Sequence, residues 1–259
     1  MSPATKGVGD RLAAWCADAA VVFGSGLAVL PDGAEVEEEL DYAALGWPEG
    51  DLAGHEHVLR LVRAPVGGAS RRLALACGRP HVYEGWRREE LEAPVRGLAA
   101  AGVRRLVLTN SCGSLGPGAP PAAVVVCGDV VDLQQAPAQE RPPRLPVCDA
   151  GTCSQVASAL VGDGPATVGT YVAVPGPQFE TPAEAAWLGA YGDVVGMSAA
   201  PEVRVARARG VECVLLAAVA NVAAAVDSHE AVLAAGGRLA RRLASGLGAA
   251  LVARWPELA

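Results

Sequence analysis

Hydrophobic and polar positions along the chain follow two alternating periods. Short apolar runs bounded by turn residues predict strands at residues 21–23, 71–76, 105–108, 123–126, 167–174 and 212–219. Apolar residues at helical spacing predict helices that start near Arg11, Arg87, Thr152, Pro182, Pro201 and Ser228. The last helix, which runs from Ser228 to about Arg254, is expected to be the longest. This alternation predicts an α/β fold in which a mostly parallel or mixed sheet is flanked by helices.

Length and composition favour one large α/β domain over residues 1–259. The chain has 259 residues, of which 51% are hydrophobic and 19% charged, so it can bury a full core. A net charge of −7 and the absence of any Lys/Arg run argue against nucleic-acid binding. No uninterrupted apolar stretch is long enough to span a membrane, and residues 1–10 lack an apolar signal core. We therefore expect a cytoplasmic protein.

The seven cysteines form no CxxC pair and no metal-ligand spacing. Their odd number and scatter predict reduced, mostly buried thiols and no bound metal. Cys77, Cys127 and Cys213 lie in apolar runs and are expected in the core. Cys112 lies between Ser111 and Gly113, where it is either another small buried thiol or part of a site.

Residues 174–184, with the sequence Val-Pro-Gly-Pro-Gln-Phe-Glu-Thr-Pro-Ala-Glu, are the most informative segment. Thr181, Pro182 and Glu184 form a strong helix start with a capping box. Phe179 and Glu180 therefore lie where a strand meets a helix, which is where open α/β sheets bind ligands. An aromatic face beside a carboxylate suits a flat heterocycle with N–H donors. The alternative is that Phe179 belongs to the core and that Glu180 is a solvated acid of the first helical turn.

Two glycine-containing segments after predicted strands carry groups that suit an anion. Residues 23–27 read Phe-Gly-Ser-Gly-Leu and offer backbone N–H groups and the Ser25 hydroxyl, although Val29 replaces the third glycine of a dinucleotide fingerprint. Residues 78–85 supply the guanidinium of Arg79 and the imidazole of His81. If this second segment is extended, Tyr83 lies on the same side of the chain as His81 and Glu84 lies on the opposite side. The alternative is an exposed surface turn.

Two further loops are expected at residues 109–114, Thr-Asn-Ser-Cys-Gly-Ser, and at residues 195–198, Val-Gly-Met-Ser. The first offers small residues that allow close backbone approach to a ligand. In the second, Ser198 near a helix start is either an anion donor or a plain N-cap. Pro, Gln and Glu are frequent between residues 133 and 146, which predicts a surface loop or flap there.

Together these segments supply two groups of side chains. Ser25, Arg79, His81 and Ser198 suit one tetrahedral anion, and Glu180 and Asn221 suit a heterocycle bounded by Phe179, Tyr83 and Met197. The chain has four histidines, of which His55 and His229 also lie beside glycine-containing or loop segments.

Six short motifs in this order resemble the trimeric purine nucleoside phosphorylases. They are Gly-Ser-Gly-Leu, Gly-Arg-x-His-x-Tyr-Glu-Gly, Thr-Asn-x-x-Gly, Gly-Pro-x-Phe-Glu-Thr-Pro-Ala-Glu, Val-Gly-Met-Ser and Ser-His-Glu-x-Val-Leu-Ala-Ala-Gly. The resemblance extends from about Val21 to Gly236. It implies a nucleoside phosphorylase fold with a central mixed, partly barrel-like sheet flanked by helices. It also implies a homotrimer, and reversible phosphorolysis of purine (2′-deoxy)ribonucleosides to free base and (deoxy)ribose 1-phosphate.

The resemblance also implies roles for individual residues. Phosphate, a co-substrate in a reaction that needs no cofactor, would be held by Ser25, His55, Arg79, His81, Ser111 and Ser198. Tyr83 and Met197 would pack against ribose, and His229 would reach its 5′-hydroxyl. Phe179 would lie against the purine, Glu180 would accept from N1–H, and Asn221 would hydrogen-bond N7 as the base departs. Glu180, Asn221 and His81 would be the catalytic residues.

The sequence departs from the family at the rim of the site. Ala220 stands where the family usually has Thr before Asn221, and residues 134–146 contain no aromatic residue to donate to a neighbouring subunit. The pair of Glu180 and Asn221 favours 6-oxopurines such as inosine and guanosine. Open alternatives are a 5′-modified or 6-aminopurine nucleoside such as methylthioadenosine, a hydrolase on the same fold, and a non-catalytic nucleoside-binding relative.

Overall fold

The computed structural model describes residues 3–134, 143–161, 164–225 and 229–259, without the side chains of residues 3–8 and 229–233. Its strands are β1 (Ala19–Val22), β2 (Glu35–Asp41), β3 (Val58–Val66), β4 (Ala69–Cys77), β5 (Arg105–Ser114), β6 (Val124–Asp132), β7 (Arg144–Pro146), β8 (Ala166–Ala173), β9 (Val194–Gly196) and β10 (Glu212–Val222). Its helices are α1 (Pro3–Trp15), α2 (Tyr42–Leu45), α3 (Arg88–Leu91), α4 (Ala93–Ala100), α5 (Ala150–Leu160), α6 (Pro182–Leu188), α7 (Ala200–Ala208) and α8 (His229–Arg254), with 3₁₀ turns at Val82–Glu84 and Pro256–Leu258.

All these strands belong to one mixed sheet that closes partly on itself. The order β10-β6-β8-β9-β5 is joined into a ring by a further pairing between β5 and β10, which gives five strands a barrel-like arrangement. From β5 the sheet continues as an open wing in the order β1-β4-β3-β2, and β7 pairs with β6 outside the ring. The expected mixed, partly barrel-like α/β fold is confirmed.

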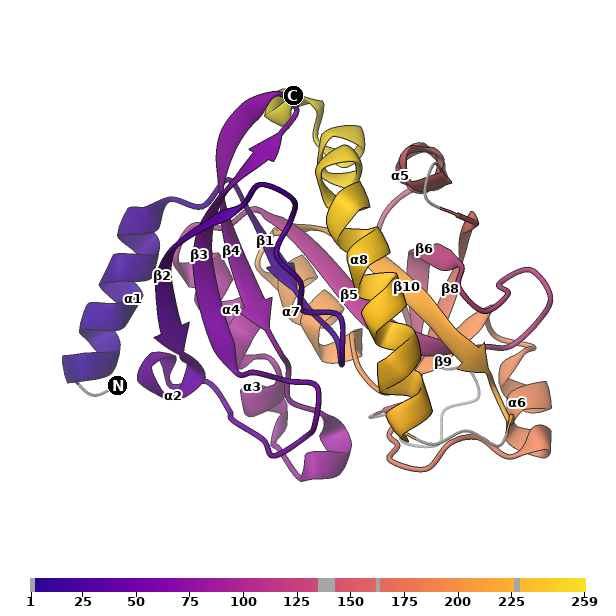
Figure 1. Cartoon of the computed structure of the whole chain (residues 1–259). Coiled ribbons are helices and arrows are strands. Elements are labelled where there is room, and N and C mark those ends of the chain that lie inside the picture. Colours follow the sequence, from indigo (N-terminus) through magenta and orange to yellow (C-terminus); the bar gives the residue numbers. More distant parts are fainter. Residues whose placement is uncertain (1–2, 135–142, 162–163, 226–228) are drawn as a thin grey trace.

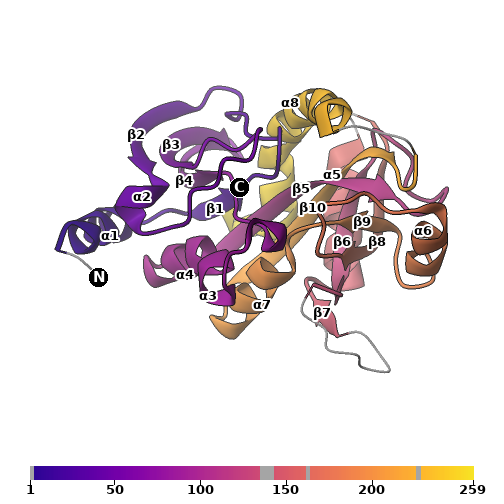
Figure 2. The ribbon, with the colours of Figure 1, turned by 90° about the horizontal axis from the view of Figure 1, so that it is seen from below.

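Helices cover both faces of the sheet (Figures 1 and 2). One face packs against α5 and α8 through a cluster that includes Val156 and Leu243, and the opposite face packs against α1, α4 and α7 through residues such as Val95 and Val203. Alternate residues of β5 enter the two clusters, because successive side chains of a strand point to opposite faces: Leu106 and Leu108 contact one and Val107 the other. Helix α8 is the longest, as predicted.

Parallel pairing brings several strand ends to the same edge. Strand β1 is parallel to both β4 and β5, and β5 is parallel to β10. The segments that follow β1 and β4 therefore lie beside the carboxyl-terminal halves of β5 and β10. This is the edge at which open α/β sheets bind ligands.

Several sequence expectations about elements are wrong. The loop expected at residues 195–198 begins within a strand, because Val195 and Gly196 belong to β9. Residues 109–114 are the second half of β5 rather than a loop, because β10 pairs with them as far as Ser114. Strands β2 and β3 were not among the expected strands: β2 reads Glu-Val-Glu-Glu-Glu-Leu-Asp, and its acids hide the strand pattern. Residues 144–146 of the expected flap form β7, while residues 135–142 lie outside the described part.

The expectation that all cysteines are reduced is also wrong. Cys148 and Cys153 form a disulfide with their Cα atoms 6.3 Å apart. Asp149 caps α5 directly after Cys148, so the first helical turn brings Cys153 back beside it. The other cysteines are free, and Cys77, Cys127 and Cys213 lie in the core as predicted. Within the described ranges, no helix combines the length and the apolar character that crossing a membrane requires.

Candidate active site

A cavity of about 240 Å³ opens at the shared strand edge. Nine of the twelve predicted site residues line it: Ser25, His81, Tyr83, Ser111, Phe179, Glu180, Met197, Ser198 and Asn221. Arg79 and His55 contact members of this set, and the side chain of His229 lies outside the described part. Segments that are up to 196 positions apart in the sequence thus converge on one cavity. After the ligands that the sequence predicts, we call the part lined by Ser25, His81 and Ser198 the anion end, and the part lined by Phe179, Glu180 and Asn221 the base end.

At the anion end, Ser25 is oriented by His55. The Nε2 atom of His55 lies 2.9 Å from Ser25 Oγ, and His55 Nδ1 accepts a hydrogen bond of 3.2 Å from the backbone N–H of Arg79. Because Nδ1 acts as the acceptor, the ring proton is on Nε2, which donates to Ser25 Oγ. The Ser25 hydroxyl hydrogen is left free to donate into the cavity.

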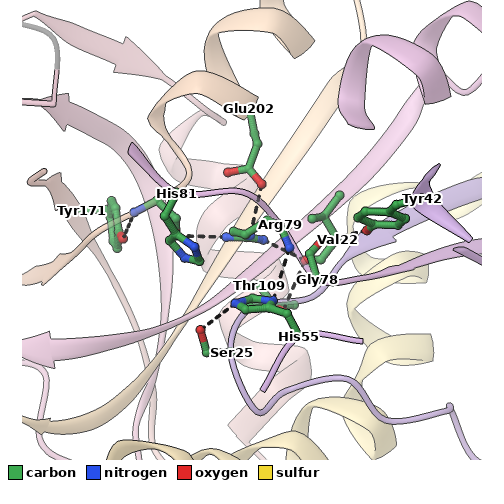
Figure 3. A network of polar contacts seen from close by, with 12 residues as sticks. Val22, Ser25, Tyr42, His55, Gly78, Arg79, His81, Thr109, Tyr171 and Glu202 are labelled. Carbon is green, nitrogen blue, oxygen red and sulfur yellow. Dashed lines mark hydrogen bonds and ion pairs between the residues drawn. The ribbon is translucent and has the colours of Figure 1, made fainter. Parts of the chain in front are cut away.

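Arg79 lies behind the cavity wall instead of lining the cavity. Its side chain is 1% exposed, Nη1 donates to Ser198 Oγ at 3.1 Å and Nη2 donates to the Val22 carbonyl at 3.0 Å. Its Nε is paired with Glu202 Oε1 at 3.1 Å, as a buried ion pair without hydrogen-bond geometry. Figure 3 shows Arg79 at the centre of this network, with Glu202 and His55 on opposite sides. Arg79 therefore fixes Ser198 and the backbone around it.

Ser198 is not an N-cap, contrary to one of the two expectations for it. Helix α7 is preceded by Ala199, which provides no side-chain cap. The Ser198 backbone N–H donates to the Tyr171 hydroxyl at 3.4 Å, while its Oγ accepts from Arg79. Since Ser198 Oγ receives a hydrogen bond from a buried cation, its own hydrogen is available to the cavity.

His81 is held by Glu84 and Tyr83. Glu84 accepts from the His81 backbone N–H at 2.6 Å and lies 3.2 Å from Nδ1, while the Tyr83 ring stacks on the imidazole with centroids 4.9 Å apart. Residues 82–84 form a 3₁₀ turn, so the extended segment that would have put Glu84 on the other side does not form, and Tyr83 and Glu84 both lie against His81. Burial opposes ionisation of Glu84, but the hydrogen bonds from His81 outweigh it and lower the Glu84 pKa.

Strand β5 forms the floor of the cavity. Gly24 packs directly on it, since a Cβ at Gly24 would lie 2.7 Å from Asn110 Cα. Ser111 Oγ donates to the Ser25 carbonyl at 3.1 Å. Cys112 is buried and also lines the cavity, so both expectations for this thiol hold, and burial raises its pKa.

At the base end, Phe179 and Glu180 stand in the loop before α6. Thr181 and Glu184 form the predicted capping box, which fixes the end of this loop. Phe179 is 37% exposed and lines the cavity, so the alternative expectation that it belongs to the core is wrong. Glu180 also lines the cavity, and burial raises its pKa.

Asn221 faces the same space from the end of β10. The register between β10 and β5 shifts between Val219 and Asn221, and Asn221 pairs with Gly113. A Cβ at Gly113 would lie 3.3 Å from Asn221 Oδ1, so the glycine allows the amide to approach the strand. The side chains of Met197 and Tyr83 both lie against Gly176, so closely that a Cβ at this glycine would meet both. These two side chains therefore belong to one wall of the cavity.

Sequence reasoning missed Asn110, which lines the cavity, and Glu202, which pairs with Arg79. Asn110 lies in the Thr-Asn-x-x-Gly motif, and Glu202 follows Pro201 at the start of α7, so both lie within segments that the sequence singled out. Among the residues whose positions are described, no group of three or more His, Cys, Asp or Glu side chains could hold a metal ion.

The sequence and the fold are similar to those of known proteins. The family model described as "Phosphorylase superfamily" matches residues 25–252. A purine nucleoside phosphorylase of Mycobacterium leprae is 36% identical over 261 residues, covering 97% of this chain and 95% of that protein. Crystal structures of Schistosoma mansoni purine nucleoside phosphorylase with inosine and with adenosine are both 28% identical, have TM-scores of 0.76 and 0.77, and each cover 95% of both chains.

The fold and the site thus define a member of the phosphorylase superfamily. Within it, the chain belongs to the purine nucleoside phosphorylase family.

Proposed function

We propose that this protein catalyses the reversible phosphorolysis of purine (2′-deoxy)ribonucleosides, with 6-oxopurines as the preferred bases. The observation that carries the proposal is the single cavity in which hydroxyl and imidazole groups lie at one end and a carboxylate and an amide at the other. The relatives named above are purine nucleoside phosphorylases, which supports the same reaction.

The anion end suits inorganic phosphate. Ser25 and Ser198 each have a hydroxyl hydrogen directed by a fixed partner, and His81 adds an imidazole. His55 and Arg79 would act through Ser25 and Ser198, and Ser111 would contribute from the floor. Such fixed donors stabilise charge without having to reorganise during the reaction.

In the forward reaction a phosphate oxygen forms a bond to C1′ while the bond from C1′ to the purine nitrogen breaks. The bonding electron pair leaves with the base, so positive charge develops on the sugar and negative charge on the purine. The phosphate dianion stabilises the positive charge on the sugar and then captures the sugar, through positioning and electrostatics. Asn221 would hydrogen-bond N7 and stabilise the negative charge on the departing purine.

The base end supports a 6-oxopurine. A carboxylate at Glu180 accepts from N1–H, a hydrogen that inosine and guanosine carry and adenosine lacks. Phe179 offers a ring face to the purine, and Tyr83 and Met197 form the wall that would contact ribose. His229 is assigned to the ribose 5′-hydroxyl on the sequence resemblance.

A 6-aminopurine or 5′-modified nucleoside is the second candidate. The related Schistosoma mansoni enzyme has been crystallised with adenosine as well as with inosine, so one family member accommodates both bases. Ala220, which precedes Asn221, lacks the hydroxyl that the Thr usual in the family would supply at this end of the site.

Release of base from inosine, guanosine, adenosine and methylthioadenosine, each with and without phosphate, tests the proposal. We expect phosphate-dependent release that is fastest with inosine and guanosine. Equal release without phosphate would identify a hydrolase and reject phosphorolysis. Protection of the protein by nucleosides without turnover of any of them would identify a non-catalytic binding protein.

We also propose a homotrimer, on the resemblance of the sequence motifs. Light scattering after size exclusion should give three times the chain mass of 26.2 kDa. A monomeric mass in an active preparation would reject this assembly.

A further inference from the structure

His57 is a buried histidine that the proposed reaction does not use. It is 8% exposed and directly precedes β3, with a backbone φ of 54°. Its N–H donates to the Cys77 carbonyl at 3.0 Å, and its carbonyl accepts from the Tyr42 N–H at 2.9 Å, so its backbone is fixed. Glycine adopts this left-handed conformation freely, whereas a residue with a Cβ does so at a cost in free energy. We therefore looked for a contact of the His57 side chain that offsets this cost.

The contact is a hydrogen bond from the segment of residues 49–55, Glu-Gly-Asp-Leu-Ala-Gly-His. The backbone N–H of Gly50 donates to His57 Nε2 at 3.4 Å. Because a backbone N–H can only donate, Nε2 must carry a lone pair, and the neutral imidazole has its proton on Nδ1. The ring centroid of His57 lies 5.8 Å from that of Tyr42 and 5.9 Å from that of His55. Neutral His57 thus attaches the start of segment 49–55 to the start of β3.

Segment 49–55 forms part of the cavity wall. Leu52 lines the cavity, and His55 orients Ser25. These two residues of the segment are joined, because the His55 N–H donates to the Leu52 carbonyl at 3.3 Å. The position of the segment therefore determines where the Leu52 side chain and the group that orients Ser25 lie.

Gly50 also lies against the carboxylate that holds His81. A Cβ at Gly50 would collide with Oε1 of Glu84. The other carboxylate oxygen of Glu84 accepts from the His81 backbone N–H at 2.6 Å and lies 3.2 Å from His81 Nδ1. Gly50 thus contacts both His57 and Glu84, so a shift of Gly50 would disturb the group that fixes His81.

We propose that His57 is a positioning residue for the anion end: in its neutral form it holds segment 49–55 in place, and its protonation releases this segment. A proton on Nε2 turns the acceptor into a donor, which breaks the hydrogen bond from Gly50. The anion is then bound less tightly, because Ser25 and His81 are no longer fixed. That this anion is phosphate rests on the proposed function.

The surroundings of His57 favour its neutral form at neutral pH. The titratable groups around it are Glu49, Asp51, Glu84, His55, His81 and Tyr42. Burial lowers the His57 pKa most, the acids oppose it, and His81 lowers the pKa further, so that the pKa lies below the ordinary value of about 6.5. Tyr42 stays uncharged, because burial raises its pKa. The release of segment 49–55 is therefore expected at mildly acidic pH.

Calorimetric titration of inorganic phosphate, without nucleoside, at a series of pH values between about 5 and 8 tests this role. His57→Gln offers an acceptor close to the place of Nε2 but does not titrate, and His57→Leu fills the space without an acceptor. Phosphate and the other histidines also titrate, so the affinities of wild type and variant are compared as a ratio at each pH, in which the shared contributions cancel.

At the upper end of this range, wild type and His57→Gln should bind phosphate equally within about twofold. As the pH falls, the wild type should lose about three- to tenfold in affinity relative to His57→Gln and then level off. His57→Leu should bind more weakly than His57→Gln by that same factor at every pH. Circular dichroism checks that each variant is folded, and His57→Gly, which suits the left-handed backbone, replaces His57→Leu if the latter does not fold.

NMR of protein labelled with ¹⁵N in histidine and glycine observes the hydrogen bond itself, without phosphate. At the upper end of the pH range, His57 Nε2 should give the signal of an unprotonated nitrogen, which His57→Gln identifies by its loss. The Gly50 amide signal should shift as His57 takes up its proton in the wild type and should not shift in His57→Gln.

A ratio of wild-type to His57→Gln affinity that stays constant over the pH range would overturn the proposal. So would a neutral His57 with its proton on Nε2, or an unchanged phosphate affinity in folded His57→Leu or His57→Gly. A Gly50 signal that follows the protonation of His57, in a protein that binds no phosphate, would uphold the release of segment 49–55 and reject the proposed function. A protein that binds no phosphate and whose Gly50 signal does not respond would reject both.

Discussion

The two ends of the cavity differ in how their side chains are held. At the anion end, Ser25, His81 and Ser198 each contact a second residue that fixes them, namely His55, Glu84 and Arg79. At the base end, Phe179 is 37% exposed and stands with Glu180 in a loop.

Under the proposed function the two ends have different tasks. An anion end with fixed donors is prepared for charge before the ligand arrives, which is how enzymes stabilise a transition state most effectively. Phe179 and Glu180, which stand in a loop, are held less tightly than the donors at the anion end. Substitutions at the anion end should therefore affect the fold as well as the reaction, and those at the base end only the reaction.

The largest expected effect comes from the buried pair of Arg79 and Glu202. Arg79→Met leaves the Glu202 carboxylate, which is 4% exposed as a residue, without its cation, and should lower the free energy of unfolding by about 3–5 kcal/mol in urea denaturation. The double variant Arg79→Met/Glu202→Leu should recover most of that stability but not phosphate binding. Arg87→Met, which breaks an exposed pair, is the control and should leave the free energy of unfolding essentially unchanged. A stable single variant would refute the claim that the anion end depends on this pair.

Asn221→Ala should reduce kcat for inosine about 30- to 1000-fold, the effect of losing one donor to a developing anion. Its unfolding midpoint should stay unchanged, because Asn221 stands partly exposed at the end of β10. Steady-state kinetics and thermal unfolding measure both quantities. Near-normal kcat would show that Asn221 does not assist the leaving base, and a large loss of stability would remove the contrast between the two ends.

Glu180→Gln should lower kcat/KM for inosine roughly 10- to 100-fold, since the bond to N1–H loses its charged acceptor. An ordinary glutamate has a pKa of about 4.3. Because burial raises the Glu180 pKa, the wild-type carboxyl takes up its proton at a higher pH than an ordinary glutamate does. With saturating phosphate, wild-type kcat/KM should therefore fall as the pH drops through that raised pKa, and the variant should lack this limb. Adenosine, which has no N1–H, is the matched control substrate, and an equal loss with adenosine would contradict the role.

The smallest expected effect is that of Ser25→Ala, which removes one hydroxyl donor and leaves His55 in place. Phosphate affinity should fall roughly three- to tenfold, equivalent to about 1 kcal/mol. Titration calorimetry with the wild type as reference measures it. A loss larger than that of the double variant at Arg79 and Glu202 would mean that Ser25, and not the Arg79 network, organises the anion end.

The sequence predicted the positions of Phe179 and Glu180 because the signals there are local. The capping box of Thr181 and Glu184 is contained in four residues, and it places Phe179 and Glu180 at the mouth of the cavity. The assembly of Ser25, His81, Ser198 and Asn221 was also predicted, from loop composition and from resemblance to a family.

Tertiary contacts explain what the sequence did not predict. Residues 109–114 are small and polar, as in a loop, and become a strand only because β10 pairs with them. The position of Arg79 behind Ser198 depends on α7 bringing Glu202 to it, which no local pattern indicates. The disulfide of Cys148 and Cys153 depends on the way the chain enters α5.

The central claim is that the anion end holds phosphate as the group that captures the sugar. Phosphorus-31 NMR of a reaction with inosine and phosphate, with hypoxanthine measured in parallel, tests it directly. The account predicts one ribose 1-phosphate for each hypoxanthine released, with an equal loss of inorganic phosphate. Hypoxanthine released with free ribose and an unchanged phosphate signal would contradict it.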